Sequence, residues 1–471
     1  MIVDVEVRRE GDPRFGKLSS LNISHFDKNG DTKFLEIPLN NSTEGYIWEY
    51  ANGRLDKPDE QYRSWDNKPV KKVKTSNINK YTIEEILYHR RDEILPALEY
   101  NEPKKFSIDI ETEITDGFPD PEFALNKVTA IAIANCTDKK ITVLGLRDMT
   151  EMDHDKIQND INVHFKKYPN DKWAFRYIKF ESEYDMLYTF FGKLMNKMPC
   201  ITGWNVLRFD WMYLVNRAER IKINPAIAGP LRGRDRIPQH KLIIDYLDIV
   251  KKWDRVIKIK ENYKLDYIAE RATGIAKIKY PGTLKSLYDN DFVKFIFYNA
   301  VDAILVHYID QKLNTMTTFL KLGHIAQVEI NRAFSPVWVQ EALMCREFLR
   351  RDKVFIDTNK DTIEQKHFVG AWVKEPIIGM HEWVACYDFA SLYPNCIMQF
   401  NISPEMYLGK STSGMVEERQ IICANGNVFD NTNDSVLRVI LQDLYGQRKT
   451  TKVKMLDINK EIDFLKRYLL K

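Results

Sequence analysis

Apolar and polar positions alternate in different ways along the chain, and each pattern predicts its own kind of element. Near the N-terminus, the alternation in IVDVEV and in HFDKNGDTKFLEI, with a turn signal at Asn29–Gly30, predicts short strands and a hairpin. Residues 56–80 are polar, contain proline and become basic toward their end, so we interpret them as a long loop or linker. The stretch YTIEEILYHRRDEILPALEY then has helical spacing. We therefore expect a β-rich N-terminal domain over residues 1–104.

A different pattern begins at residue 105. FSIDIET, VTAIAIANC and KKITVLGL predict strands, and ESEYDMLYTFFGKLMNKM follows with helical spacing, so we expect an α/β domain over residues 105–324. Residues 325–380 are mixed and would complete the N-terminal domain. WVACYDFA predicts a strand that opens a further β-rich domain over residues 381–435, and residues 436–471 predict one long helix. The fold class expected from these patterns is multidomain α/β and α+β.

The amino-acid composition indicates the general class of protein but says little about its binding partners. A chain of 471 residues with 44% hydrophobic and 29% charged residues is ordinary for a soluble protein of several domains, and a net charge of +3 is nearly neutral. The six cysteines are scattered without a C-x-x-C pair, which argues against a zinc ribbon and a disulfide framework. The apolar runs have the length of strands and no secretory signal is visible, so we expect a cytoplasmic protein without a membrane partner.

The first candidate for chemistry lies in FSIDIET. It places Asp109 and Glu111 two positions apart on an expected strand, so both carboxylates point to the same face. An exposed acidic strand edge is the commoner origin of a single D-x-E. Further motifs change that balance.

Two later strings add polar groups in a fixed order. ITGWNVLRFDW brings Asn205 and the pair Phe209–Asp210 directly after a strand-like run. YNAVDAILVHYID places Tyr298 and Asp302 at i and i+4, which puts them on one face of a helix. Taken singly, these residues could be a helix cap, a core aromatic residue or a solvated carboxylate. Four carboxylates in this order, with a tyrosine four residues before the last, are much more specific.

These strings resemble the three exonuclease motifs of DnaQ-like 3′→5′ proofreading domains of the tyrosine-containing subtype, which have a ribonuclease H-like fold. The resemblance implies two Mg²⁺ ions, for which Mn²⁺ can substitute, that activate a water and stabilise the leaving 3′-oxygen. Tyr298 would orient the attacking water, and Asn205 and Phe209 would contact the substrate. The implied metal ligands are Asp109, Glu111, Asp210 and Asp302.

A second site is indicated by YDFASLYPNC, which contains a carboxylate, Asp388, directly before Phe389. A buried strand that runs into a proline-terminated turn is the alternative interpretation. The string resembles motif A of family B DNA polymerases. The resemblance implies that Asp388 and the Phe389 carbonyl hold the two ions of nucleotidyl transfer, while the backbone N–H groups of Ser391 and Leu392 cradle the triphosphate. Tyr393 would stack under the sugar and exclude a 2′-hydroxyl group.

The expected C-terminal helix carries a basic pair. Arg448 and Lys452 lie at i and i+4, so they share one helix face. They resemble the pair on the first fingers helix of the same family, which grips the triphosphate of a bound dNTP. A merely solvated helix is the alternative.

Other parts of the family pattern do not occur in the sequence. The strings K-x-x-x-N-S-x-Y-G (motif B) and Y-G-D-T-D-S (motif C, with the second catalytic aspartate) are absent from the 471 residues. The strings IIDYLDIVKKW and KLDYIAE are similar to those of polymerases of T-even-like bacteriophages. The resemblance therefore implies the N-terminal portion of such an enzyme, with a partial palm over 381–435 and a truncated first fingers helix over 436–471.

The leading hypothesis is therefore one subunit of a split DNA-directed DNA polymerase with 3′→5′ exonuclease activity. The partners implied are primer–template DNA, a single-stranded 3′ end, dNTPs, a second polypeptide that carries motifs B and C and the thumb, and a sliding clamp reached through that polypeptide. One alternative is a stand-alone 3′→5′ exonuclease, which would be active without a partner. The other is a nucleic-acid-binding assembly module without catalysis, against which the four carboxylates count.

Overall fold

The chain forms two compact units. The computed structural model describes residues 1–13, 16–53, 56–113, 119–257, 261–356, 370, 373–411 and 416–469. The first unit comprises Met1–Arg9, Ser19–Leu39 and Asp92–Val339. The second unit comprises Glu10–Leu18, Asn40–Arg91 and Gln340–Lys471.

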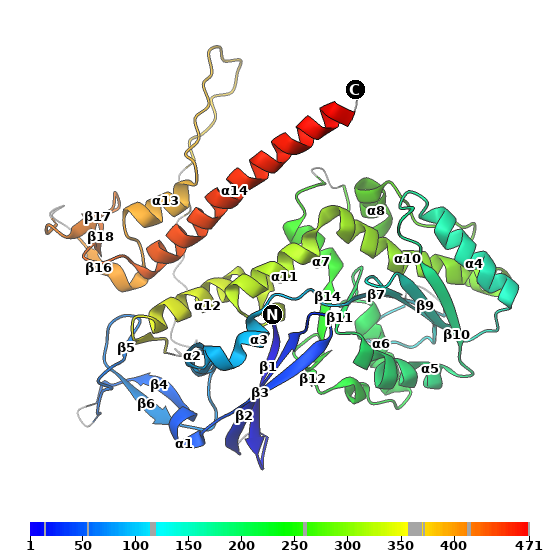
Figure 1. Cartoon of the computed structure of the whole chain (residues 1–471), viewed down its shortest axis with the longest axis horizontal. Coiled ribbons are helices and arrows are strands. Elements are labelled where there is room, and N and C mark those ends of the chain that lie inside the picture. The colour runs from blue at the N-terminus through cyan, green and yellow to red at the C-terminus, as the bar shows by residue number, and fades with distance from the viewer. Residues whose placement is uncertain are drawn as a thin grey trace. The chain divides into compact units, whose positions relative to one another are not determined.

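A six-stranded mixed sheet forms the centre of the first unit, in the order β10–β9–β8–β7–β11–β14 (Figure 1). Strand β8 runs antiparallel to β7 and β9, whereas β10–β9, β11–β7 and β11–β14 are parallel pairs. The strands predicted at FSIDIET, VTAIAIANC and KKITVLGL are β7, β8 and β9, which confirms the mixed α/β class. The strands are β7 (Lys105–Thr112), β8 (Val128–Asn135), β9 (Lys140–Gly145), β10 (Ala174–Lys179), β11 (Cys200–Gly203) and β14 (Leu242–Asp245).

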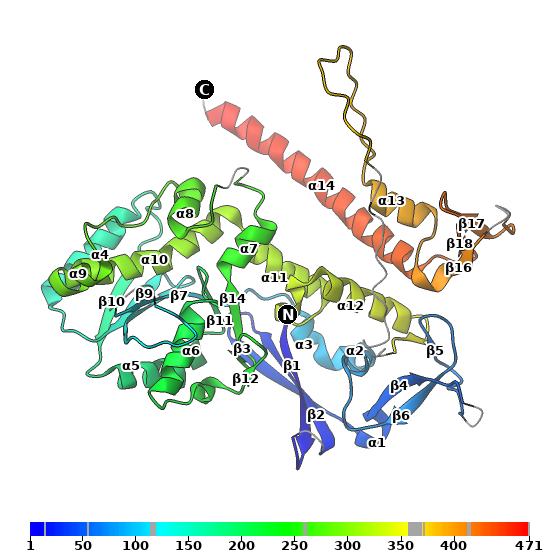
Figure 2. The same cartoon turned by 180° about the vertical axis from the view of Figure 1, so that it is seen from behind.

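Helices cover both faces of this sheet. Helix α10 packs against β7, β8 and β9, with α4 beside it, while α5 and α6 lie on the opposite face (Figures 1 and 2). Ile108 and Ile110 of β7 pack into the core with Trp211 of α6. Because side chains alternate along a strand, residues 109 and 111 face α10 on the other side of the sheet. The helices are α4 (Glu151–His164), α5 (Glu183–Thr189), α6 (Asp210–Arg220), α7 (Tyr246–Trp253), α8 (Leu265–Thr273), α9 (Leu284–Asn290), α10 (Phe292–Leu313) and α11 (Thr315–Ala326).

Helix α10 is apolar almost all round because it lies inside the unit. By length and composition it is the one helix among the described residues that could cross a membrane, but most of it is buried in the protein. A helix buried on all sides has little polar surface to present to solvent. The buried polar residues on it, Asn299 and Asp302, therefore need partners inside the protein.

The N-terminal strands confirm the predicted hairpin and correct one interpretation. β1 (Ile2–Glu10), β2 (Lys17–Phe26) and β3 (Thr32–Pro38) pair in that order, and Gly30 takes a φ of 78° in the turn between β2 and β3. The interpretation of residues 56–80 as a loop was wrong in part, because β6 (Val70–Lys74) pairs antiparallel with β4 (Tyr46–Tyr50). Buried Val70 and Trp48 hold this pair together, although its exposed lysines gave it the composition of a loop.

Short elements complete both units. These are α1 (Asn41–Glu44), α2 (Lys80–His89), α3 (Leu95–Leu98), α12 (Pro336–Leu349), the β5 (Arg63–Ser64) and β15 (Lys353–Val354) pair, and the β12 (Leu231–Arg232) and β13 (Ile237–Pro238) pair.

The C-terminal part of the second unit contains α13 (Leu392–Gln399), a small sheet and the long helix α14 (Val436–Leu469), which was predicted. The sheet has the order β16–β18–β17, formed by Tyr407–Lys410, Asn427–Asp430 and Gln420–Ile422. The strand predicted at WVACYDFA was wrong: residues 383–390 lie in no helix or strand. Their alternating apolar side chains are exposed, and no described strand pairs with them, so the pattern alone does not form a strand.

Candidate active sites

Three of the predicted carboxylates meet between β7 and α10. Asp109 and Glu111 project from the α10-facing side of β7, and Asp302 projects from α10; one oxygen of each lies within 4.8 Å of the others. Glu111 and Asp302 are 7% and 3% exposed. Carboxylates gathered so closely away from water are stable only with protons or cations between them, and hard oxygen donors suit Mg²⁺ or Mn²⁺.

The fourth carboxylate, Asp210, lies beside the same strand but outside that group of three. It is the first residue of α6, it is buried, and its Oδ1 accepts a hydrogen bond from the backbone N–H of Ile110 at 3.0 Å. Its charge helps to raise the pKa values of Asp109 and Glu111, so it belongs to the same electrostatic site.

The pKa values of the four carboxyl groups are all raised. Burial is the main cause; it raises the pKa of Glu111 to about 8 and that of Asp210 to about 7. For Asp109 the repulsion of Asp302, Asp210 and Glu111 adds to burial, and burial also raises the pKa of Asp302. Without a cation the site therefore retains protons near neutral pH, and a divalent cation would displace them.

Two residues that the sequence analysis did not single out complete this site. The Lys277 ammonium lies 2.5 Å from Oδ2 of Asp302 and 4.9 Å from the ring centre of Tyr298. Although burial would lower its pKa, the charge of Asp302 raises it, so Lys277 is a cation. Tyr298 lies near enough to Asp302 to oppose the rise in the pKa of that carboxyl group. The Asn299 amide donates to Oδ2 of Asp109 at 2.8 Å.

The available donor atoms fit a cation. Oδ1 of Asp302 and Oδ1 of Asn299 are buried and have no hydrogen-bond partner within the described structure. A buried polar atom without a partner is costly, and a carboxylate oxygen left in that way beside two further carboxylates is a typical metal ligand. The residues present therefore suit divalent cations held by oxygen.

The turn before α6 explains how Asn205 and Phe209 are placed. Asn205 has a φ of 63°, its N–H donates to Oδ1 of Asp245 at 3.1 Å, and its carbonyl accepts from the Phe209 N–H at 3.0 Å. Asparagine tolerates this left-handed conformation better than most residues. The turn ends at Asp210, so the N-x-x-x-F-D spacing positions that carboxylate against β7.

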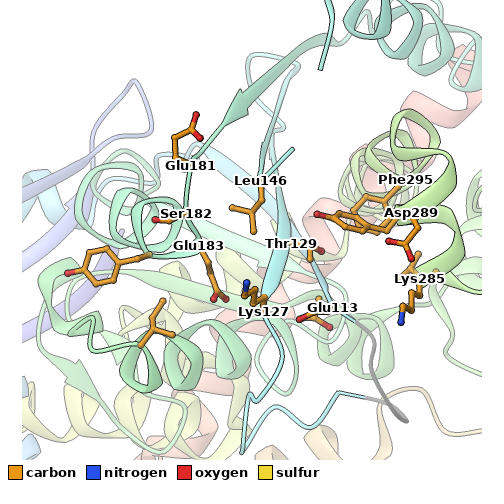
Figure 3. A pocket seen from close by; sticks show the side chains of 15 residues that line it. Glu113, Lys127, Thr129, Leu146, Glu181, Ser182, Glu183, Lys285, Asp289 and Phe295 are labelled. Atoms are coloured by element: carbon orange, nitrogen blue, oxygen red, sulfur yellow. The ribbon is translucent and has the colours of Figure 1, made fainter. Parts of the chain in front are cut away.

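A pocket of about 560 Å³ opens where β7 ends, two residues beyond Glu111 (Figure 3). In Figure 3, Glu181, Ser182 and Glu183 line one side and Lys285, Asp289 and Phe295 the other. Glu113 and Lys127 lie between the two sides. Its lining mixes both signs of charge with apolar groups, and the volume is in the range of small-molecule sites.

The motif A residues are arranged quite differently. Phe389 and Tyr393 are 76% and 77% exposed, and Asp388 is exposed too. The three-carboxylate group described above is the one potential metal cluster among the described residues, and it does not include Asp388. Ser391 has a φ of 53° at the start of α13, and its side chain accepts no hydrogen bond from the first turn of that helix, which begins at Leu392.

Buried polar residues fix α13 to the start of α14. The Asn401 amide donates to the Asp430 and Asn433 carbonyls, and its Oδ1 accepts from the N–H of Ser435 at 2.9 Å. Glu405 accepts from the N–H of Val436 at 2.7 Å. Arg448 and Lys452 are exposed further along α14. The structure therefore links the motif A helix and the basic helix through one hydrogen-bonded turn, within the second unit.

Two family comparisons match this chain. The family described as DNA polymerase family B, exonuclease domain, matches residues 60–268, and the family described as DNA polymerase family B matches residues 337–469.

Individual relatives agree with these families. The DNA-directed DNA polymerase of Escherichia phage RB69 is 28% identical over 396 residues, which covers 77% of this chain and 43% of the relative. The DNA-directed DNA polymerase of Enterobacteria phage T4 is 25% identical over 76% of this chain, and a DNA polymerase of Archaeoglobus fulgidus is 27% identical over 82% of it; each match again covers 43% of the relative. The chain thus spans less than half the length of these relatives.

Proposed function

The chain belongs to the family B DNA polymerases, and we propose from this that it supplies the 3′→5′ exonuclease and half of the nucleotidyl-transfer site of a DNA-directed DNA polymerase. The observation that carries the exonuclease part is the buried group of Asp109, Glu111 and Asp302 with Lys277 beside it. The mixed sheet with carboxylates on its α10-facing side supports a ribonuclease H-like fold for this domain.

In the proposed exonuclease, each residue has a role that its contacts allow. Two Mg²⁺ ions, or Mn²⁺ in their place, would supply an activated water and stabilise the leaving 3′-oxygen. Asp109, Glu111 and Asp302 would hold the ions, with Asp210 completing the set, while Asn299 orients Asp109. Tyr298 would orient the attacking water, and the Lys277 ammonium opposes the effect of burial by favouring the ionised form of Asp302.

Asn205 and Phe209 lie on the turn that leads into Asp210, where they would contact the 3′-terminal nucleotide. The substrate proposed for this site is a single-stranded DNA 3′ end. Because all these groups belong to the first unit, the chain alone should catalyse the hydrolysis. This observation also favours a stand-alone exonuclease as the second candidate function.

For nucleotidyl transfer, the second unit would contribute one wall. Asp388 and the Phe389 carbonyl would hold the ions, and the amides of Ser391 and Leu392 at the open start of α13 would cradle the triphosphate of a dNTP. Tyr393 would pack under the sugar. Arg448 and Lys452 would bind the triphosphate from α14, whose start is fixed to α13.

The other wall would come from a second polypeptide that carries motifs B and C and the thumb, with a sliding clamp recruited through it in the cytoplasm. Helix α14 supports this part of the proposal. Met455, Ile458, Ile462, Leu465 and Leu469 follow one another at spacings of three and four residues and are all exposed. Such a stripe typically packs against another apolar helix. An antiparallel helix carrying motif B would cover it.

The test of the exonuclease is the double variant Asp109→Ala/Glu111→Ala. Hydrolysis of a 5′-labelled oligonucleotide in Mg²⁺ should fall by at least about 10⁴-fold, because the metal site loses two of its ligands. Asp155→Ala, which removes an exposed carboxylate on α4, is the matched control and should keep full activity. Activity retained by the double variant would contradict the assignment, and binding without hydrolysis by the unaltered chain would favour the assembly-module alternative.

A further inference from the structure

Helices α7 and α8 of the first unit (Figure 1) and the segment between them carry cations next to aromatic rings. The Lys251 ammonium lies 5.4 Å from the ring centre of Tyr263, and the Arg271 guanidinium lies 5.5 Å from that of Tyr267. Lys264 lies between them in the sequence, at the start of α8. The stripe consists of Lys251, Tyr263, Lys264, Tyr267 and Arg271.

Its members share one surface. Lys264 directly precedes α8, and positions 264, 267 and 271 are three and four residues apart, so they follow one side of that helix. The three cations are exposed and the two rings are partly exposed. Within the described structure, neither Lys251 nor Lys264 has a carboxylate partner at ion-pair distance. Cations left without an internal partner on the same face as aromatic rings are available to an external anion.

The surrounding segment is much more basic than the chain as a whole. Over residues 251–257 and 261–279, exposed cations outnumber exposed carboxylates six to two, whereas the entire chain carries a net charge of only +3. The exposed carboxylates are Glu261 and Glu270, while the remaining two, Asp254 and Asp266, accept backbone hydrogen bonds. This concentration of exposed positive charge in one segment is the electrostatic pattern of a nucleic-acid contact.

The stripe is connected to the carboxylate site at two points. The indole N–H of Trp204, next to Asn205, donates to the carbonyl of Tyr263 at 3.1 Å. Asp266 of α8 accepts from the backbone N–H of Lys277 at 2.7 Å, and α8 packs on α10. A chain bound along the stripe would therefore lie next to the walls of the site.

We propose that the stripe binds single-stranded DNA, with its cations on the phosphates and its rings available to bases. Cationic grooves that also offer aromatic faces are typical of proteins that bind single strands without sequence preference. The inference rests on the proposed exonuclease for its substrate. What it adds to that function is a binding surface outside the carboxylate site for the part of the DNA strand that precedes the 3′-terminal nucleotide. The affinity for DNA and the rate of hydrolysis would then depend on different residues.

The test uses the full chain and fluorescence anisotropy with a labelled oligo(dT) in EDTA, so that binding is measured without hydrolysis. The triple variant K251E/K264E/R271E should bind at least about thirtyfold more weakly at low salt. The slope of log affinity against log salt should fall by about 2, since each phosphate contact on a single strand contributes about 0.7. The control K193E/K197E/K312E makes a similar charge change at exposed lysines elsewhere in the first unit, and should change the slope little.

Two further readouts separate this inference from the proposed exonuclease. Hydrolysis by the stripe variant at saturating oligonucleotide in Mg²⁺ should stay within about twofold, so that the loss appears in KM and not in kcat. If the unaltered chain binds oligo(dT) through the stripe but hydrolyses nothing, the exonuclease fails and the stripe stands. Equal affinities and slopes for the stripe and control variants would overturn the inference, as would a loss confined to a hairpin duplex probe.

Discussion

The two carboxylate regions of this chain have equally clear sequence motifs but very different structures. Asp109, Glu111 and Asp302 are brought together by a strand and a helix that pack on each other, and a lysine and an asparagine contact them. Asp388 stands on an exposed segment outside any strand. The first region has the preorganisation that catalysis requires before a substrate arrives, whereas the second does not.

The difference follows from where the packing partners are. Strand β7 lies in the middle of a sheet and is covered on both faces, so Glu111 is buried and Asp109 is half-buried. Among the described residues, the motif A segment is held by the α13–α14 turn through Asn401 and Glu405, and by the Asn395 amide, which donates to the Ala390 carbonyl. A motif therefore identifies the chemistry, while the completeness of a site depends on the elements that surround it.

The largest effects should be opposite in the two regions. With the proposed second polypeptide and a primed template present, Asp388→Ala should abolish dNTP incorporation, since the ions of nucleotidyl transfer would lose one of their ligands. The same variant should hydrolyse single-stranded DNA normally. Asp109→Ala/Glu111→Ala should show the reverse, with synthesis retained and hydrolysis lost. Both activities are measured on one labelled primer in parallel reactions.

Two results would break this comparison. Primer extension by the unaltered chain alone would mean that the second unit already contains a complete site. Synthesis that persists in the Asp388→Ala mixture would mean that another carboxylate performs its role. In either case the region around Asp388 would not be half of a site.

The next largest effect should come from Lys277. Lys277→Met keeps much of the volume of the side chain but removes the charge that faces Asp302 at 2.5 Å. We expect hydrolysis to slow about a thousandfold at saturating substrate, on the scale of losing a preorganised charged contact in a buried site. The control is Lys279→Met, two residues further on and exposed, which should be nearly neutral. Equal rates for both variants would assign Lys277 a structural role.

The sequence predicted the elements of the first region because its patterns are local. FSIDIET alternates within one strand, and Tyr298 and Asp302 share a helix face by spacing alone. Lys277 and Asn299 were missed because their roles depend on packing: Lys277 reaches Asp302 from outside the motifs, and Asn299 is a neighbour of Tyr298 with no marked chemistry. The one sequence feature that could have pointed to Lys277 is the string K-I-K-Y, residues 277–280. Its last residue, Tyr280, packs against Tyr298.

The failures in the second unit have the same origin. Residues 70–74 looked like part of a polar loop, although Val70 is fully buried against β4. WVACYDFA looked like a strand, although a strand forms only where another can pair with it. Alternation along one segment contains no information about whether a partner lies beside it.

A smaller effect is expected from Tyr298. Tyr298→Phe removes the hydroxyl group that influences the pKa of Asp302 and leaves the ring beside Lys277. Hydrolysis should slow by roughly tenfold to a thousandfold, the range for one positioning or acid–base contact. Mn²⁺ affinity, measured by titration calorimetry, should be unchanged. A neutral effect on single-turnover hydrolysis would leave Tyr298 as a core aromatic residue.

The smallest effect concerns stability, and it also separates the two regions. Burial raises the pKa of Glu111 from 4.5 to about 8 and that of Asp210 from 3.8 to about 7. Between about pH 4 and pH 8 the folded protein therefore binds more protons at these groups than the unfolded chain does. The stabilising contribution is fully present below pH 4 and is lost as the pH rises through the folded values.

In EDTA, the midpoint of thermal unfolding of the first unit should therefore fall by several degrees between pH 5.5 and pH 8.5, as measured by scanning calorimetry. Glu111→Gln replaces a carboxyl group, which loses its proton as the pH rises, with an amide that does not ionise. The unfolding midpoint of this variant should therefore fall less with pH and should exceed that of the unaltered chain at pH 8.5. Asp388→Asn, which makes the same kind of change at an exposed side chain, is the control for the substitution itself. Saturating Mg²⁺ should raise the midpoint of the unaltered chain most at the higher pH, because bound cations replace the protons that the carboxylates have lost. If Glu111→Gln and the unaltered chain gave parallel curves in EDTA, the carboxylates would not be held together in the folded protein, and the contrast between the two regions would disappear.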